Sequence, residues 1–228
     1  MPHQCLTLEQ AQMETRAQDC AMLCSMKYKL IGRFAVVCLV LIAACSKGPQ
    51  VTPLAQDAVV LAFGDSLTFG TGAQPAESYP AQLGGIIGRK VVNAGVPGEI
   101  SEDGLKRLPE VLEETQPKLL ILCHGGNDFL RKLSELQAAA NLRAMIHLAK
   151  QKNIGVVLIA TPKPGLTLSP PDFYAEIAKE FAIPFNDDIL KSVLRDNALK
   201  SDLVHPNAAG YAAIAKTVAK VLKKAGAV

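Results

Sequence analysis

The sequence predicts an α/β fold, namely a three-layer α/β/α sandwich around a central, mostly parallel five-stranded sheet. Three observations lead to this prediction. Short apolar runs bounded by turn residues lack polar alternation, as expected for parallel strands that are covered on both faces. Longer stretches with a helical apolar period lie between these runs. Strands that alternate with helices along the chain favour a parallel sheet covered by helices on both sides.

Four of the five expected strands can be placed, because each is rich in leucine or β-branched residues. They are residues 59–63, 91–92, 119–123 and 156–160. Helices are predicted at about residues 79–87, 102–114, 134–152, 173–181 and 208–224. The last of these helices has one clearly apolar face, formed by Tyr211, Ile214, Val218, Val221 and Leu222. No internal repeat is evident, so the elements are assigned to a single domain.

The most apolar segment lies near the N-terminus. Residues 34–44 carry no charge, and Lys27, Lys29 and Arg33 precede them. Eleven residues make about 16 Å of helix, roughly half of the hydrocarbon core of a bilayer. A basic region, a short apolar region and small residues at its end are typical of a signal peptide. A buried core helix is the alternative interpretation.

The end of this segment, Ile42-Ala43-Ala44-Cys45, resembles a bacterial lipobox. The resemblance implies that the chain is cleaved after residue 44 and that Cys45 is acylated. Ser46 in the next position implies the outer membrane. The predicted organisation is therefore a signal peptide at 1–44, a lipidated Cys45 with a proline-containing tether at 45–56, and a globular domain at 57–228. The expected location is the bacterial periplasm, with a lipid anchor in the membrane.

Residues 1–25 do not fit a signal peptide, because they contain acidic and polar residues that such a peptide does not need. A start at Met26 would open the chain with MKYKLIGRF, a compact basic region. Residues 1–25 would then lie outside the translated protein. A genuine long region before the apolar segment is the alternative.

Composition excludes several classes of function. The net charge is only +3, and the basic residues are scattered among acidic ones, so nucleic acid is not an expected partner. Four of the six cysteines precede residue 45, which leaves Cys123 as the one free thiol of the mature chain and excludes a disulfide within it. No cluster of cysteine and histidine has the spacing of zinc ligands, so no metal and no cofactor is predicted.

A candidate nucleophile follows the first strand directly, in the segment Gly64-Asp65-Ser66-Leu67-Thr68. Ligands of open α/β sheets bind beyond the carboxyl ends of the strands, so Ser66 is well placed to meet a substrate. The alternative is that a serine in this position only caps a helix. The G-x-S-x-G pattern of a nucleophile elbow does not occur in the chain.

A nucleophilic serine needs a base, and three histidines follow residue 45. His147 lies in the middle of a predicted helix and is interpreted as a surface or packing residue. His124 ends the third strand and could border a pocket. His205 precedes the last helix and has Asp202 three residues before it, so the carboxylate can curl back to accept the Nδ1–H and leave Nε2 free toward the serine.

Hydrolysis of an acyl group also needs donors for a developing oxyanion. The second strand ends in a segment with two glycines, Gly95 and Gly98, that let a backbone N–H approach a ligand closely. The third strand ends in Gly125-Gly126-Asn127-Asp128, in which the Asn127 amide is a suitable neutral donor. Each segment by itself could be a turn, but together they follow different strands of one predicted sheet.

In this order, GDSLTFG, the Gly98 turn, GGND and DLVHPN resemble the four blocks of the SGNH (GDSL) hydrolases over about residues 57–225. The branch that contains bacterial arylesterases and thioesterase I/lysophospholipase L1 enzymes is the most similar, and the segment RLPEVLEETQPKLLIL supports it. The resemblance implies a flavodoxin-like SGNH fold and a serine acylhydrolase that cleaves carboxylic esters or thioesters through an acyl-enzyme. It implies that Ser66 is the nucleophile, with Asp202 and His205 completing the triad. Its oxyanion hole would consist of the Ser66 N–H, the Gly98 N–H and the Asn127 side chain.

Two departures from the family pattern are visible. Glu99 stands where Asp is common, and Cys123-His124 stands where relatives usually carry an acidic–apolar pair. In addition, the proline-rich segment 161–171 is shorter than in thioesterase I relatives, which weakens the expectation of their long-chain specificity. Two other functions stay open, namely a carbohydrate O-acetylesterase in the periplasm and a non-catalytic lipoprotein that uses the fold for binding.

Overall fold

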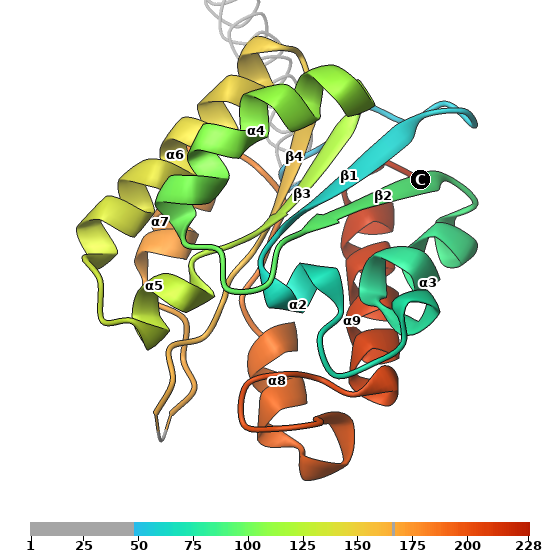
Figure 1. Cartoon of the computed structure of the whole chain (residues 1–228). Coiled ribbons are helices and arrows are strands. Elements are labelled where there is room, and N and C mark those ends of the chain that lie inside the picture. The colour runs from blue at the N-terminus through green and yellow to red at the C-terminus, as the bar shows by residue number, and fades with distance from the viewer. Residues whose placement is uncertain (1–47, 166) are drawn as a thin grey trace, which may run out of the picture. The chain divides into compact units, whose positions relative to one another are not determined.

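The computed structural model describes residues 48–165 and 167–228. Its centre is a five-stranded sheet with the strand order β2-β1-β3-β4-β5, in which every neighbouring pair is parallel. The strands are β1 (Val59–Gly64), β2 (Lys90–Gly95), β3 (Leu119–Cys123), β4 (Gly155–Ile159) and β5 (Phe185–Asn186). The predicted α/β class and the parallel five-stranded sheet are therefore confirmed (Figure 1).

Helices cover both faces of this sheet, as Figure 1 shows. One layer consists of α3 (Tyr79–Ile87), α8 (Ile189–Arg195) and α9 (Ala208–Lys224), and the other of α4 (Ser101–Thr115), α6 (Glu135–Gln151) and α7 (Phe173–Glu180). Successive strand residues point to opposite faces. Val60 and Ala62 accordingly pack in the core with α9, whereas Leu61 and Phe63 pack in the core with α4 and α6. The three-layer arrangement follows directly from these two apolar cores.

Most of the predicted elements differ from the observed ones by one residue at one or both ends, β2 differs by more, and several short elements had not been placed. The edge strand β2 has six residues, whereas two were predicted. The prediction was too short because the exposed residues Lys90 and Asn93 bound the apolar pair on which it rested. The fifth strand has only two residues, which is too short to give a pattern. The helices α2 (Ser66–Phe69), α5 (Gly126–Leu130) and α8 are likewise too short for an apolar period to be recognised.

The described chain enters the domain at the end of the sheet where the strands begin. The backbone N–H groups of Val51 and Leu54 donate to the carbonyl oxygens of Ala225 and Ala227, at 2.9 and 2.8 Å. Both side chains are buried, and Val51 also lies against Gly155, the first residue of β4. Part of the segment predicted as a tether, residues 51–54, thus belongs to the packed domain.

The predicted signal peptide and Cys45 lie outside the described residues. Cys123 has a buried, free thiol, as predicted, and burial raises its pKa well above the ordinary value. Within residues 48–165 and 167–228, no helix has both the length and the apolar character that crossing a membrane requires.

Candidate active site

Ser66 lies at the carboxyl end of β1, where the chain turns directly into α2. Asp65 caps this short helix, since its Oδ1 accepts the backbone N–H of Leu67 at 3.0 Å. Two glycines make room for the turn, because a Cβ at Gly64 would overlap the carbonyl oxygen of Cys123 and one at Gly95 would overlap the backbone of Phe69. The alternative interpretation of Ser66 as a helix cap is wrong, because Asp65 is the cap.

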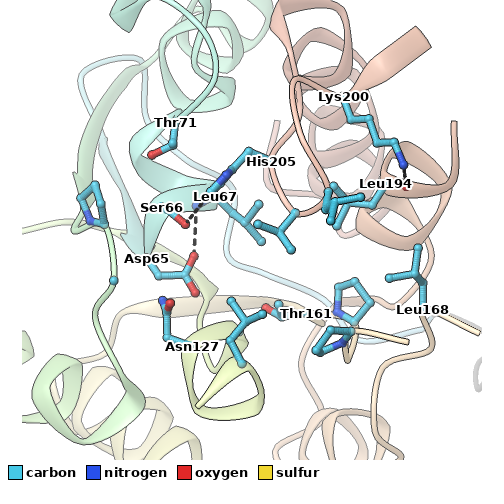
Figure 2. A pocket seen from close by; sticks show the side chains of 18 of the residues that line it. Asp65, Ser66, Leu67, Thr71, Asn127, Thr161, Leu168, Leu194, Lys200 and His205 are labelled. Atoms are coloured by element: carbon cyan, nitrogen blue, oxygen red, sulfur yellow. Dashed lines mark hydrogen bonds between the residues drawn. The ribbon is translucent and has the colours of Figure 1, made fainter. Parts of the chain in front are cut away.

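Ser66, His205 and Asp202 form a hydrogen-bonded relay. His205 Nε2 lies 3.1 Å from Ser66 Oγ, and His205 Nδ1 lies 2.8 Å from Asp202 Oδ2. Figure 2 shows Ser66 and His205 facing one another across the edge of a pocket. The structure therefore brings together three residues that are separated by up to 139 positions in the sequence.

Backbone N–H groups of the loop before α9 hold the Asp202 side chain in place. The second oxygen of Asp202 accepts the backbone N–H groups of Val204 and His205, both at 2.8 Å. Partial burial acts to raise the pKa of the Asp202 carboxyl, but the hydrogen bonds from the His205 ring and from these two N–H groups outweigh it and lower the pKa below its ordinary value. The carboxylate is thus kept ionised beside the imidazole, although its side chain is about half exposed.

Gly98 and Asn127 lie on either side of Ser66, because β1 runs between β2 and β3 in the sheet. Gly98 has a φ of 79°, a left-handed conformation that favours glycine. The Asn127 amide donates one hydrogen to the carbonyl oxygen of Glu99, at 3.0 Å, and carries a second hydrogen. Ser66 is the first residue of α2, so its N–H has no acceptor within the helix. All three predicted oxyanion residues line the same pocket.

The pocket has a volume of about 670 Å³ and opens at the carboxyl end of the sheet. Most of its walls are apolar. They include Leu67, Leu130, Leu168, Leu194, Leu203, Val204 and three prolines. Figure 2 places Ser66 and Asn127 on one side of the cavity and Leu168 and Leu194 on the other. The proline-rich segment 161–171 lines this second side, as expected for a substrate-side loop.

The other two histidines differ from His205 in their surroundings. His147 is exposed on α6 and contacts only Gln151 through its ring, at 3.0 Å, in agreement with its interpretation as a surface residue. The expectation that His124 borders a pocket is wrong, because its side chain is fully buried and does not line the cavity. Its ring instead contacts Glu99, at 3.0 Å.

Two pocket residues had not been predicted from the sequence. Asp65 is buried at the base of the cavity, and burial raises the pKa of its carboxyl above the ordinary value. Lys200 lines the far wall, and its Nζ donates to the carbonyl oxygen of Leu194 at 3.3 Å. A lysine in a loop gives no recognisable signal in a sequence, whereas the position of Asp65 next to Ser66 could have indicated a cap.

No group of three His, Cys, Asp or Glu residues in the described part of the chain could hold a metal ion. The arrangement instead offers a serine, a base with an ionised partner, and donors for an oxyanion beside an apolar cavity. These are the groups that acyl transfer through a covalent intermediate requires.

Comparison with known proteins agrees with this chemistry. The model of the GDSL-like lipase/acylhydrolase family matches residues 62–213. The thioesterase 1/protease 1/lysophospholipase L1 of Escherichia coli is 31% identical over 172 residues, which are 72% of this chain and 83% of that protein. An arylesterase of Vibrio mimicus is 29% identical over 176 residues, or 72% of this chain and 88% of the relative.

Solved structures give the same result for the fold. The crystal structure of AlinE4, an SGNH-hydrolase family esterase, is similar with a TM-score of 0.59 and 31% identity, and the match covers 75% of this chain and 98% of AlinE4. The family match includes the three strand ends near Ser66, Gly98 and Asn127 and the loop before α9 that carries His205. The chain therefore belongs to the GDSL-like lipase/acylhydrolase family and is an ester-hydrolysing enzyme.

Proposed function

We propose that Ser66 is the nucleophile, that His205 is the general base and acid, and that Asp202 orients His205. The observation that carries this proposal is the continuous relay from Ser66 Oγ through both ring nitrogens of His205 to Asp202, with separations of 3.1 and 2.8 Å. The carboxylate fixes the tautomer with the proton on Nδ1, so Nε2 is free to accept the serine proton. It also stabilises the imidazolium that forms when the proton moves.

The reaction proceeds in two halves. Ser66 Oγ attacks the acyl carbonyl carbon while His205 takes the proton, and the alcohol or thiol then leaves with that proton as the acyl-enzyme forms. Water repeats the sequence and releases the acid. The oxyanion of each tetrahedral intermediate is held by the Ser66 and Gly98 N–H groups and by the second hydrogen of the Asn127 amide. Such donors act most strongly where water is excluded from the site.

The substrate we propose is an ester or thioester with an apolar acyl group. The apolar walls around Leu168, Leu194 and Leu203 support an alkyl or aryl chain more than a sugar, which would need polar partners along the cavity. The names of the Escherichia coli and Vibrio mimicus relatives include thioesterase, lysophospholipase and arylesterase activities, which are the classes to compare first.

A series of p-nitrophenyl esters tests the choice of acyl group. We expect kcat/KM to rise from acetate toward longer chains, by up to about fourfold per methylene, since each buried CH₂ contributes about 0.8 kcal/mol. The rise should end where the chain outgrows the pocket. Acyl-CoA thioesters, lysophospholipids and acetylated xylo-oligosaccharides complete the panel. A maximum at acetate together with rapid deacetylation of the sugars would favour the carbohydrate O-acetylesterase instead.

A matched pair of variants links the chain-length effect to the pocket. Leu203 and Leu136 are equally exposed, at 82%, but only Leu203 lines the cavity. Leu203→Ser should lower kcat/KM for the longest accepted ester and leave acetate almost unchanged, whereas Leu136→Ser should alter neither. If both variants behave alike, the apolar wall does not select the acyl chain.

We also propose that the mature enzyme is a lipoprotein anchored through Cys45 in the periplasm, most consistently at the outer membrane. The lipobox-like sequence and Ser46 support this proposal. Five residues separate Cys45 from Val51, and the six steps between the two Cα atoms allow at most about 20 Å of extended chain. Val51 enters the domain where the strands begin, and the pocket opens where they end.

Cys45→Ser tests the anchor. The variant should accumulate as an unlipidated precursor that keeps its apolar segment, because the modified side chain is missing. Mass spectrometry of the N-terminal peptide gives the direct readout, with a diacylglyceryl Cys45 expected in the wild type. Cys38→Ser, in the middle of the apolar segment, is the control and should mature normally. A different N-terminal residue in the wild type would refute the anchor and leave the hydrolase assignment intact.

A further inference from the structure

Two loops that flank Ser66 are joined directly to each other. One follows β2 and comprises residues 96–101, and the other follows β3 and comprises residues 124–128; they are called the oxyanion loops below. Ser101 donates to Asp128 twice, from its backbone N–H at 2.9 Å and from its hydroxyl at 2.6 Å. Asn127 donates to the backbone carbonyl of Glu99. Because β1 separates β2 from β3, these contacts span the strand that carries the nucleophile.

The Glu99 side chain makes a further, buried connection between the oxyanion loops. It is 8% exposed, and its carboxylate accepts two hydrogen bonds from Arg107, at 2.7 and 2.8 Å, and one from His124, at 3.0 Å. Arg107 in turn reaches the carbonyl oxygen of Ala94 at the end of β2 and lies over the Phe63 ring. Burial acts to raise the pKa of Glu99, but the hydrogen bonds from Arg107 and His124 outweigh it and lower the pKa.

His124 is held in one tautomer by its neighbours. Its Nδ1 accepts the backbone N–H of Gly125 at 2.9 Å, so the ring proton lies on Nε2 and is donated to Glu99. The ring is fully buried, and the backbone carbonyl of His124 accepts the Tyr174 hydroxyl at 2.7 Å. Gly104 on α4 leaves the space for the ring, since a Cβ there would overlap His124 Nε2. The ring has no contact with the substrate cavity.

From this geometry we propose that Glu99 and His124 are a pair of positioning residues that set the spacing of the oxyanion loops. Glu99 is fixed at both ends, because its backbone carbonyl orients the Asn127 amide and its carboxylate holds the residue that precedes the Gly125-Gly126-Asn127 turn. Its neighbour in the chain, Gly98, supplies the second proposed oxyanion donor. The pair therefore acts through Gly98 and Asn127, and the proposal rests on the oxyanion hole assigned above.

Glu99 and His124, two of the three residues named above as departures from the pattern that the sequence resembles, are thus in contact with each other. Their contact sets a buried donor, the His124 ring N–H, against a buried acceptor, the Glu99 carboxylate. Loss of the Glu99 carboxylate would leave the His124 ring N–H buried without an acceptor, whereas loss of the His124 ring would leave Glu99 with Arg107 alone.

His124→Leu tests the pair, because it keeps much of the volume and removes both hydrogen bonds of the ring. We expect kcat for a p-nitrophenyl ester to fall about 10- to 100-fold with KM changed by less than about threefold, since misplaced donors weaken binding of the transition state more than of the ground state. His124→Gln, whose amide can both donate and accept, should restore part of the loss. The double variant Glu99→Gln/His124→Leu should be little worse than the poorer single variant, as expected for coupled residues.

Two further measurements make the test decisive. Met145→Ala removes a buried side chain from the same layer without touching either loop and should lower thermal stability while leaving kcat unchanged. Titration with a fluorophosphonate counts the intact Ser66 sites in each variant.

A His124→Leu enzyme that titrates fully and keeps kcat within twofold overturns the positioning role, as does additivity in the double variant. If His124→Leu does not fold, the Glu99→Gln variant provides the test instead. A kcat equal to that of the wild type in this variant would refute the positioning role of the pair. Failure of the wild type to titrate at Ser66 would instead refute the proposed nucleophile.

Discussion

Ser66→Ala is expected to abolish labelling by a fluorophosphonate and to lower kcat by about 10³-fold or more. His205 Nε2 lies 3.1 Å from Ser66 Oγ, as the proposed activation requires, and alanine has no atom that can form the acyl-enzyme. KM should change little, because the apolar walls of the pocket that bind the acyl group are intact. Intact-protein mass spectrometry after labelling and steady-state kinetics with a p-nitrophenyl ester measure both effects.

Ser192→Ala is the matched control. Ser192 is exposed on α8, hydrogen-bonds Asp188 and does not line the pocket, so this variant should label and turn over like the wild type. Residual activity in Ser66→Ala of more than a few per cent, or a label on another residue, would contradict the assignment of the nucleophile. The oxyanion donors alone should leave a small rate above that of water.

The fold was predictable where burial on both faces produces continuous apolar runs. β1, β3 and β4 lie in the centre of the sheet, and their runs of apolar residues indicated both their positions and their parallel pairing. The edge strands were harder. β2 is half exposed and β5 has two residues, and such strands owe their place to pairing with a neighbour rather than to a pattern of their own.

The contacts among the three residues of the proposed triad were predictable because each residue stands at an element boundary with its own local signal. Ser66 follows β1 directly, and the spacing of Asp202 and His205 permits the hydrogen bond that the structure contains. The contacts of Glu99 with Arg107 and His124 had no such signal, since they join side chains from different elements across the sheet. Burial of His124 likewise depends on the space left by Gly104, which only the packing of α4 reveals.

His205→Ala should be nearly as inactive as Ser66→Ala, with a fall in kcat of about 10³-fold or more. Without the imidazole, no group takes the proton of Ser66 as it attacks or returns a proton to the leaving group. The Asp202 carboxylate cannot replace the base, since it hydrogen-bonds Nδ1 and two backbone N–H groups on the far side of the ring. An ester with p-nitrophenolate as leaving group needs little protonation, so the loss should be larger for an alkyl ester of the same acid.

The three histidines then provide an internal comparison. His147→Ala should match the wild type, because the ring is exposed on α6 and contacts only Gln151. A variant of His124 should lose part of its kcat but still react with one equivalent of fluorophosphonate, since the relay through His205 is intact. His205→Ala should react with the fluorophosphonate far more slowly than either, as the serine is no longer activated. If a His124 variant were as slow to label as His205→Ala, the buried ring and not His205 would be the group that activates Ser66.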